Sequence, residues 1–429
     1  MTGAFLAWRR GVKYFAFALL GAVLGLAPFG KAAEPVKLTF AWWGNPAIAE
    51  DYQALFDLFH ERNPDIVIEQ IRWGYSADAQ EKFTVQVAAN TMPDVFMIPT
   101  IIEEALLPLD EYLERTPELA QQLLPNGLSY WRVRVDEHGV VYRGEGRQLG
   151  LPLYSFATVI AYNQDMFSEA GIASPTDWTY AEFEDVARRL TRDLNGDGHP
   201  DVWGTTWHLQ SDTGLAPVVA AHGPWPLFTT DPFDTIIDTP EVREGLYVIR
   251  RWMQELRIHR TPAEGTASFP AGQVATIQGH NDTFLGFPQA IGDQFQWDVA
   301  PMPTGPRGRK AVAFHQGIGI SAQTPHPEEA WRFVTFFLGE EGAVLQNRSI
   351  LRLSSNVLAA QDYIDRAPYT ASILIDSFQD AVPNAPGVPI GVNVARELYP
   401  VWNGQESVEA AVERLAQTIR ANLRALFAR

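Results

Sequence analysis

Short apolar segments of strand character alternate along this chain with amphipathic segments of helical period. Residues 36–40 alternate between apolar and polar side chains, and 48–59 carry apolar side chains at helical spacing. A strand pattern at 66–71, a helix pattern around 83–87 and a buried strand pattern at 95–98 follow. This order is typical of an α/β sheet with helices on its faces.

The same alternation begins again after residue 151. Strand patterns occupy 158–162 and 274–277, and helix patterns occupy 180–190, 327–338 and 408–426, the last two opened by Pro327 and Ser407. The 429 residues exceed the roughly 250–300 at which a single hydrophobic core stops growing. The sequence therefore predicts two α/β lobes.

The N-terminus has the pattern of an export signal. Arg9, Arg10 and Lys13 precede an apolar run at 14–26, which is about half of the roughly 20 residues that a spanning helix needs. We expect residues 1–33 to be a cleavable signal peptide. The small-x-small rule fits the residues before Glu34 imperfectly, so an uncleaved anchor stays open, as does twin-arginine export.

Cysteine is absent from the sequence. This excludes disulfides, thiolate metal sites and an acylated lipobox cysteine within it. An exported protein without a lipid tether is retained only where an outer membrane encloses it. We therefore expect a periplasmic protein that is not a lipoprotein.

Acidic residues outnumber basic ones, 51 to 33, for a net charge of −18. Such a field repels nucleic-acid phosphates and anionic lipid. One local basic stretch is the exception, and it is either a solvated hairpin face or a contact for an anionic ligand group. Its members are Arg132, Arg134, Arg143 and Arg147.

Short motifs follow one another in a fixed order after residue 34. They are Trp42-Trp43-Gly44, Asn63-Pro64, Met92-Pro93-Asp94-Val95, residues 150–154 leading into Tyr162-Asn163, residues 175–183, residues 317–320 and residues 327–333. This ordered set resembles the bacterial extracellular solute-binding proteins, family 1, the type that includes maltose-binding protein and other sugar-binding subunits of ABC importers.

The resemblance implies the two-lobe periplasmic binding protein fold of type II, with a ligand cleft between the lobes and a three-segment hinge. Expected are an N-terminal lobe of 34–150 plus 304–352, a C-terminal lobe of 151–303 plus 353–429, and crossings at 151–154, 299–303 and 351–355. Closure over the ligand would present a new surface to the permease subunits of the importer.

Sugars bind to aromatic rings and to side chains that donate and accept hydrogen bonds. The resemblance places such residues at Trp43, Asn45, Tyr75, Asp94, Tyr154, Asp212, Trp225, His280, Asn281, Asp282, Gln316, Gly317 and Arg352. Asn281 stands where many members have a stacking indole. This departure favours a smaller or more polar ligand than a maltodextrin.

A run of acidic and amide side chains has the spacing of a calcium loop. Asp193, Asn195, Asp197 and Asp201 fall at the first, third, fifth and ninth positions, with Gly198 at the sixth. Gly204 occupies the position of the usual bidentate Glu. Structural calcium and a solvated turn that needs no metal both fit this pattern.

No catalytic motif stands out: the sequence has no Gly-x-Ser-x-Gly elbow, no His-Glu-x-x-His pair and no phosphate loop. We expect a monomeric binding protein, without a required cofactor, that captures a mono- or oligosaccharide and delivers it to an ABC permease. The alternatives are an exported carbohydrate-active enzyme, a receptor for another solute such as glycerol 3-phosphate, and a chemosensory receptor.

Overall fold

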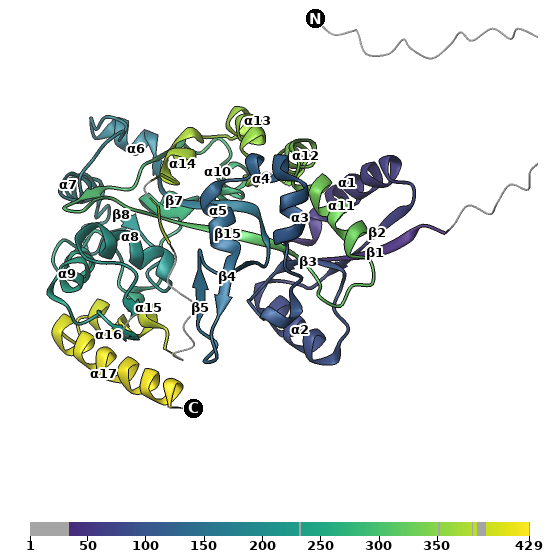
Figure 1. Cartoon of the computed structure of the whole chain (residues 1–429). Coiled ribbons are helices and arrows are strands. Elements are labelled where there is room, and N and C mark those ends of the chain that lie inside the picture. Colours follow the sequence, from purple (N-terminus) through teal and green to yellow (C-terminus); the bar gives the residue numbers. More distant parts are fainter. Residues whose placement is uncertain (1–33, 231–232, 351, 380, 384–391, 429) are drawn as a thin grey trace, which may run out of the picture.

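The computed structural model describes residues 34–230, 233–350, 352–379, 381–383 and 392–428. The predicted signal peptide, residues 1–33, lies outside these ranges. Helices cover a central sheet whose long strands run across the molecule (Figure 1). Within the described ranges, no helix combines the length and apolarity that crossing a membrane requires.

The elements up to residue 150 are β1 (Val36–Trp42), η1 (Pro46–Ile48), α1 (Ala49–Arg62), β2 (Ile66–Arg72), α2 (Ser76–Ala89), β3 (Val95–Ile98), η2 (Glu103–Ala105), α3 (Asp110–Arg115), α4 (Pro117–Gln122), α5 (Pro125–Trp131), β4 (Arg132–Val135), β5 (Val141–Arg143) and β6 (Arg147–Gln148). Then come β7 (Leu151–Asn163), α6 (Gln164–Glu169), α7 (Tyr180–Leu190), β8 (Trp203–Thr206), α8 (Asp212–His222), β9 (Phe228–Thr230), β10 (Phe233–Thr235), α9 (Pro240–Gln254), η3 (Pro262–Glu264), β11 (Val274–His280), η4 (Asn281–Phe284), α10 (Phe287–Ile291) and β12 (Trp297–Ala300).

The remaining elements are β13 (Thr304–Gly305), β14 (Gly308–Arg309), β15 (Ala311–Ile320), α11 (Pro327–Leu338), α12 (Glu340–Ile350), η5 (Val357–Ala359), α13 (Ala360–Arg366), α14 (Ser372–Ser377), β16 (Ala381–Pro383), α15 (Val394–Glu397), α16 (Tyr399–Trp402) and α17 (Val408–Phe427).

Nine strands of the described chain form one mixed sheet in the order β2-β1-β3-β15-β7-β11-β8, with β12 beside β7 and β16 beside β15. β1 runs parallel to β2 and β3, and β11 runs parallel to β8. The antiparallel pair β7 and β15 joins these two groups of strands. We call the elements around β1–β3 the first lobe and those around β8, β11 and β12 the second lobe.

Three adjacent segments carry the chain between the lobes. β15 pairs with β3 at its carboxyl end, and β7 pairs with β11 and β12 in its second half. A third segment lies along β7, where Ser155 N–H donates to Leu353 O at 2.9 Å and Ser355 N–H donates to Leu153 O at 3.0 Å. We call β7, β15 and residues 353–355 the crossing segments.

The expected lobe boundary at residue 304 falls inside a hairpin that contacts the second lobe. Thr304 N–H donates to Trp178 O at 2.8 Å, and Arg307 N–H donates to Ala221 O at 3.0 Å. The expected crossing at 299–303 follows β12, which pairs with β7 inside the second lobe. We therefore propose that the second lobe extends to residue 310 and that the second crossing is β15.

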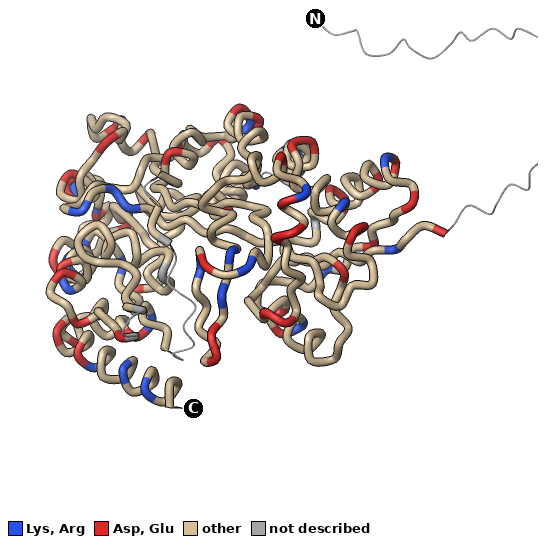
Figure 2. Tube along the Cα trace, viewed as in Figure 1, with Lys and Arg blue, Asp and Glu red and all other residues tan. Residues whose placement is uncertain are grey.

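Each lobe buries apolar side chains on both faces of its part of the sheet. In the first lobe, α1 and α11 cover one face and α2 covers the other; in the second lobe, α7, α9 and α17 cover one face and α10 and α14 the other. β7 and β15 contain no Asp, Glu, Lys or Arg, whereas the helices around them carry charges of both signs (Figure 2). The two longest crossing segments thus contribute no charge of their own.

Several helices begin and end where the sequence predicts. α7 and α11 have the predicted bounds, and Thr179 caps α7 by accepting from Glu182 N–H at 3.2 Å while Glu182 accepts from Thr179 N–H at 2.7 Å. β7 is longer than the predicted strand at 158–162. All 13 of its residues are buried, so no apolar–polar alternation marks its first half.

We expect the aromatic cluster between β1, α1 and α11 to stabilise the first lobe strongly. Phe333 is fully buried, with its ring centroid 5.4 to 5.7 Å from those of Phe40, Phe56 and Phe59. Phe333→Ala should lower the free energy of unfolding by about 3–5 kcal/mol. Urea denaturation measures this loss. As the control, Leu358→Ala at a half-exposed position should change stability by no more than about 0.5 kcal/mol.

Candidate functional site

The carboxyl ends of strands from both lobes meet beside the third crossing segment. Gly44 follows β1, and its N–H donates to Gly74 O after β2 at 2.9 Å. A Cβ on Gly44 would lie 4.0 Å from Arg352 Nη2. β11 of the second lobe ends at His280, two residues before Asp282, which pairs with Arg352. Ligands of open α/β sheets bind at such strand ends, so we take this place as the candidate site.

An ion pair lies at the centre of this site. Arg352 Nε donates to Asp282 Oδ1 at 2.9 Å, and the two side chains are only 18% and 28% exposed. Burial opposes the positive charge of Arg352, but the combined effects of Asp282, Tyr52 and Tyr154 outweigh it and hold the pKa of the guanidinium above its usual value. The pair as a whole presents little net charge to a ligand.

Two tyrosines lie under the guanidinium. Arg352 Cζ is 5.5 Å from the ring centroid of Tyr154, whose hydroxyl oxygen is 3.0 Å from that of Tyr52. Burial raises the pKa of Tyr52 to about 12, so both phenols stay neutral at physiological pH. The cation is therefore held by a carboxylate on one side and an aromatic face on the other.

Aromatic rings from β7, β15 and β11 form an apolar patch beside the ion pair. Phe156 and Phe314 stack with centroids 4.7 Å apart, and His280 meets both edge-on at 5.7 and 5.2 Å. Burial lowers the pKa of His280 to about 4, which keeps the imidazole neutral. Stacked rings next to fixed donors and acceptors are the chemistry that sugar recognition requires.

The structure brings four of the predicted ligand residues together, namely Tyr154, His280, Asp282 and Arg352. Sequence analysis missed Phe156 and Phe314. Both lie on the same face of the crossing segments as Tyr154, which depends on the pairing of β7 with β15. Period-two alternation predicts the face only when that register is known.

Three further predicted residues lie at the carboxyl ends of β1 and β2. Trp43 is half-buried against the first-lobe core, and Asn45 is exposed. Tyr75 is 60% exposed and stands under Arg72, whose Cζ is 5.2 Å from the ring centroid. Their contact with a ligand stays a prediction.

Two predicted residues are engaged inside the crossing region. Asn281 is 1% exposed, and its Nδ2 donates to Ser155 O at 3.1 Å. Gln316 Nε2 donates to Ile98 O at 3.2 Å. Both side chains hold the backbone around the site, and their contact with a ligand stays a prediction.

Asp94 and Trp225 are described away from this cluster, and Asp212 is described by its backbone alone. Asp94 lies at the amino end of β3, where it accepts from Thr39 N–H and Oγ1 at 2.8 Å each and from Thr324 Oγ1 at 2.6 Å. Trp225 is half-buried against the second-lobe core. Asp212 is the first residue of α8, and its side chain lies outside the described part of the structure.

In the expected calcium loop, the side-chain oxygens accept hydrogen bonds from backbone N–H groups of the same loop. Asp193 accepts from Gly196 N–H and Gly198 N–H at 2.7 and 2.8 Å, and these bonds lower its pKa. Backbone N–H groups of the loop also donate to the side chains of Asn195, Asp197 and Asp201. Among the described residues, no group of three or more His, Cys, Asp or Glu is arranged to hold a metal ion. Calcium at this loop stays a prediction, beside the solvated turn.

A family profile described as "Bacterial extracellular solute-binding protein" matches residues 44–344. This chain belongs to that family. Its fold is shared with an ABC substrate-binding protein from Listeria monocytogenes in complex with cycloalternan, at a TM-score of 0.73 and 24% identity over 91% of this chain and 99% of the other. It is also shared with the sugar-binding protein MalE from Xanthomonas citri, at a TM-score of 0.75 and 20% identity. This match covers 92% of this chain and 100% of the other.

A curated relative from Streptomyces antibioticus is 24% identical over 344 residues, which are 75% of this chain and 70% of that protein. It is named an uncharacterized lipoprotein in the oleD 5' region. Family membership makes this chain an extracellular or periplasmic protein. The name of the relative gives no support to the expectation that a lipid anchor is missing here.

Gly317, another predicted ligand residue, is needed for packing in β15. A Cβ at this position would lie 2.3 Å from Trp131 Cε2, and Trp131 is only 4% exposed. Gly317→Ala should therefore lower the free energy of unfolding by about 1–3 kcal/mol. Gly286→Ala is the control, since a Cβ there meets nothing within 4 Å. Equal urea midpoints for both variants would contradict this account.

Stability should fall in mild acid through His315, on the opposite face of the crossing segments from Phe314. Burial, with a smaller effect of Arg143, lowers the pKa of His315 to about 3 from 6.5. Between those values the unfolded chain binds more protons than the folded chain, so the free energy of unfolding decreases as pH falls.

From pH 7 to pH 5 this one imidazole should account for a loss of about 2 kcal/mol. His315→Gln should reduce the pH dependence measured by urea unfolding at the two pH values, whereas the exposed His199→Gln should leave it unchanged. An unaltered slope in His315→Gln would refute the assignment.

Proposed function

We propose that this chain is the extracytoplasmic substrate-binding protein of an ABC-type importer and that it captures a small sugar between its lobes. The observation that carries the proposal is the Arg352–Asp282 pair beside the stacked Phe156 and Phe314, at strand ends from both lobes. Residues of two lobes around one ligand allow closure to be driven by binding. The closed form would then deliver the sugar to the membrane permease.

The charge balance of the site favours a neutral ligand. Arg352 is already paired with Asp282 at 2.9 Å, so a phosphate or carboxylate would have to displace that carboxylate. A sugar hydroxyl can instead donate to Asp282 and accept from Arg352 without breaking the pair. This is why we place a sugar ahead of glycerol 3-phosphate.

The size of the ligand depends on how many aromatic rings are available to stack on it. Phe314 and Trp43 are half-buried, and each can offer part of a ring face to the C–H groups of a sugar. Asn281 holds the position of the expected indole and is turned into a backbone hydrogen bond. A mono- or disaccharide fits this arrangement better than a long oligosaccharide.

An exported carbohydrate-active enzyme is the rival function. Glycoside hydrolysis needs two carboxyl groups roughly 5–10 Å apart on either side of the bond. In the described site, the cluster around Arg352 contains Asp282, which is held by that cation. Family membership also supports binding without turnover, so we propose that the protein is not an enzyme.

We propose that the mature protein is a periplasmic monomer, exported through the signal at residues 1–33. The Streptomyces relative is named a lipoprotein, but the present sequence has no cysteine that could be acylated. Retention by an outer membrane would then replace a lipid tether. Neither a metal nor a cofactor is needed for the proposed capture of a sugar.

A panel of mono- and disaccharides, with glycerol 3-phosphate as the anionic comparison, tests this function. One sugar should raise the melting temperature and change tryptophan fluorescence saturably, and mass spectrometry should recover it unaltered. Asp282→Ala should weaken the binding of that sugar by about 10-fold or more, because it removes a charged hydrogen-bonding partner. The exposed Asp293→Ala is the matched control and should bind like the parent.

Consumption of the stabilising sugar would refute the receptor function. If glycerol 3-phosphate binds tightly and no sugar binds, the proposal that the ligand is a sugar is refuted. If Asp282→Ala binds the sugar as well as Asp293→Ala does, the function stands but the site is misplaced.

A further inference from the structure

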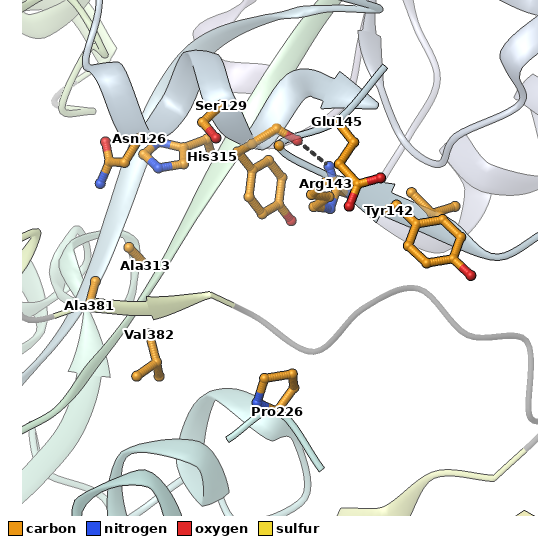
Figure 3. A pocket seen from close by; sticks show the side chains of 13 residues that line it. Asn126, Ser129, Tyr142, Arg143, Glu145, Pro226, Ala313, His315, Ala381 and Val382 are labelled. Atoms are coloured by element: carbon orange, nitrogen blue, oxygen red, sulfur yellow. Dashed lines mark hydrogen bonds between the residues drawn. The ribbon is translucent and has the colours of Figure 1, made fainter. Parts of the chain in front are cut away.

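A cavity of about 430 Å³ lies between the lobes, away from the candidate sugar site. Its floor is β15 at Ala313 and His315, with α5 and the β4–β5 hairpin on one side and the loop after α8 together with β16 on the other (Figure 3). Both lobes contribute side chains to this cavity.

The cavity and the sugar site lie on opposite faces of the crossing segments. His315 is paired with Ser155, and Ser155 Oγ lies 2.8 Å from His315 Nδ1 on the cavity side. Phe314 and Phe156, the next pair, stack on the side of the sugar site. Successive side chains of a strand point to opposite faces, so one ligand cannot occupy both places.

Apart from His315 on the floor, the polar side chains of the cavity come from the first lobe, and the second-lobe wall is apolar. Asn126, Ser129, Tyr142 and Arg143 come from the first lobe, whereas Pro226, Ala381 and Val382 come from the second. Figure 3 shows the apolar side chains across from the hairpin. A ligand that fills the space therefore needs a polar end and an apolar body.

Arg143 determines the nature of the polar end. Its Nη1 donates to Tyr130 O at 2.8 Å, and its Cζ lies 3.7 Å from the Tyr130 ring centroid and 5.2 Å from that of Trp131. Burial lowers the pKa of this guanidinium. Among the described residues, no carboxylate forms an ion pair with it. A desolvated cation in such a position favours an anionic partner.

The other ionisable groups of the cavity leave this role to Arg143. Glu145 is bound by Arg134 through Nε and Nη2 at 3.1 and 3.0 Å. His315 is neutral, because burial and Arg143 hold its pKa at about 3. The cavity thus offers a single unneutralised charge, and that charge is positive.

We propose that this cavity is a second binding site, specific for a small organic carboxylate with an apolar body. The carboxylate accepts hydrogen bonds from the guanidinium of Arg143. The body lies against Val382, Pro226 and Ala381, where it removes apolar surface from water. Such a ligand contacts both lobes at once.

Isothermal titration of the full chain with benzoate tests this site, with glucuronate as a carboxylate of hydroxylated body. Benzoate should bind saturably and more tightly than glucuronate. Arg143→Gln should weaken benzoate by at least about 10-fold, and Arg143→Lys should restore part of the loss. Arg147→Gln, in the same basic stretch but exposed and paired with Glu103, should bind benzoate like the parent.

The proposal is overturned if benzoate shows no saturation at concentrations of about 10 mM, if Arg143→Gln and Arg147→Gln bind it equally, or if glucuronate binds more tightly. Asn126→Trp provides a second test should Arg143→Gln fail to fold, because an indole at this exposed rim position narrows the cavity and should abolish benzoate binding. Asp282→Ala should leave benzoate binding unchanged. If this variant loses benzoate binding, benzoate binds at the sugar site and the proposal is overturned.

The two proposals fail separately. Sugar binding should survive in Arg143→Gln, as benzoate binding should survive in Asp282→Ala. A sugar that is lost in Arg143→Gln and retained in Asp282→Ala would place the sugar in this cavity and overturn both site assignments, while leaving the receptor function intact.

Discussion

The antiparallel pairing of β7 with β15 is the interaction on which both lobes depend. β7 is a single strand of 13 buried residues, and its first half completes the first lobe while its second half completes the second. The two strands carry no charged side chains, and most of their residues are buried. Both candidate sites lie against these strands, one beside Phe156 and Phe314 and the other beside His315.

The two faces of that pair differ in chemistry because successive side chains alternate. On one face, Phe156 and Phe314 adjoin the Arg352–Asp282 pair, which is close to electrical neutrality. On the other, His315 adjoins the cavity with the unpaired Arg143. A neutral sugar and a carboxylate are therefore matched to different sides of one structural element. Motion of the lobes about these strands changes both sides together.

Much of the fold could be predicted because its signals are local. The Thr179–Glu182 capping box and the amphipathic pattern of 180–190 define α7 without any tertiary information. The predicted strand at 95–98 likewise has the observed bounds of β3. The crossing at 299–303 was predicted from resemblance alone; because β12 pairs with β7 there, we propose β15 as this crossing instead.

Prediction of the site was more limited. His280, Asp282 and Arg352 were named from the sequence, but their ion pair and the stacked phenylalanines depend on contacts between residues about 70 positions apart or more. The sequence motif at Asp94 is equally typical of a hydrogen-bonded strand end, and the glycine at 317 is equally typical of close packing. Neither pattern by itself distinguishes these roles from contact with a ligand.

By itself the sequence determined an exported, acidic, two-lobe α/β protein of the solute-binding family, because periodicity, composition and ordered motifs are properties of contiguous residues. Only the tertiary structure decided which side chains share a face of β7 and β15, and which charges meet a partner. The sequence does not distinguish the surroundings of Arg352 from those of Arg143. One is neutralised by Asp282 and the other faces a cavity, and that difference arises only when the strands are paired.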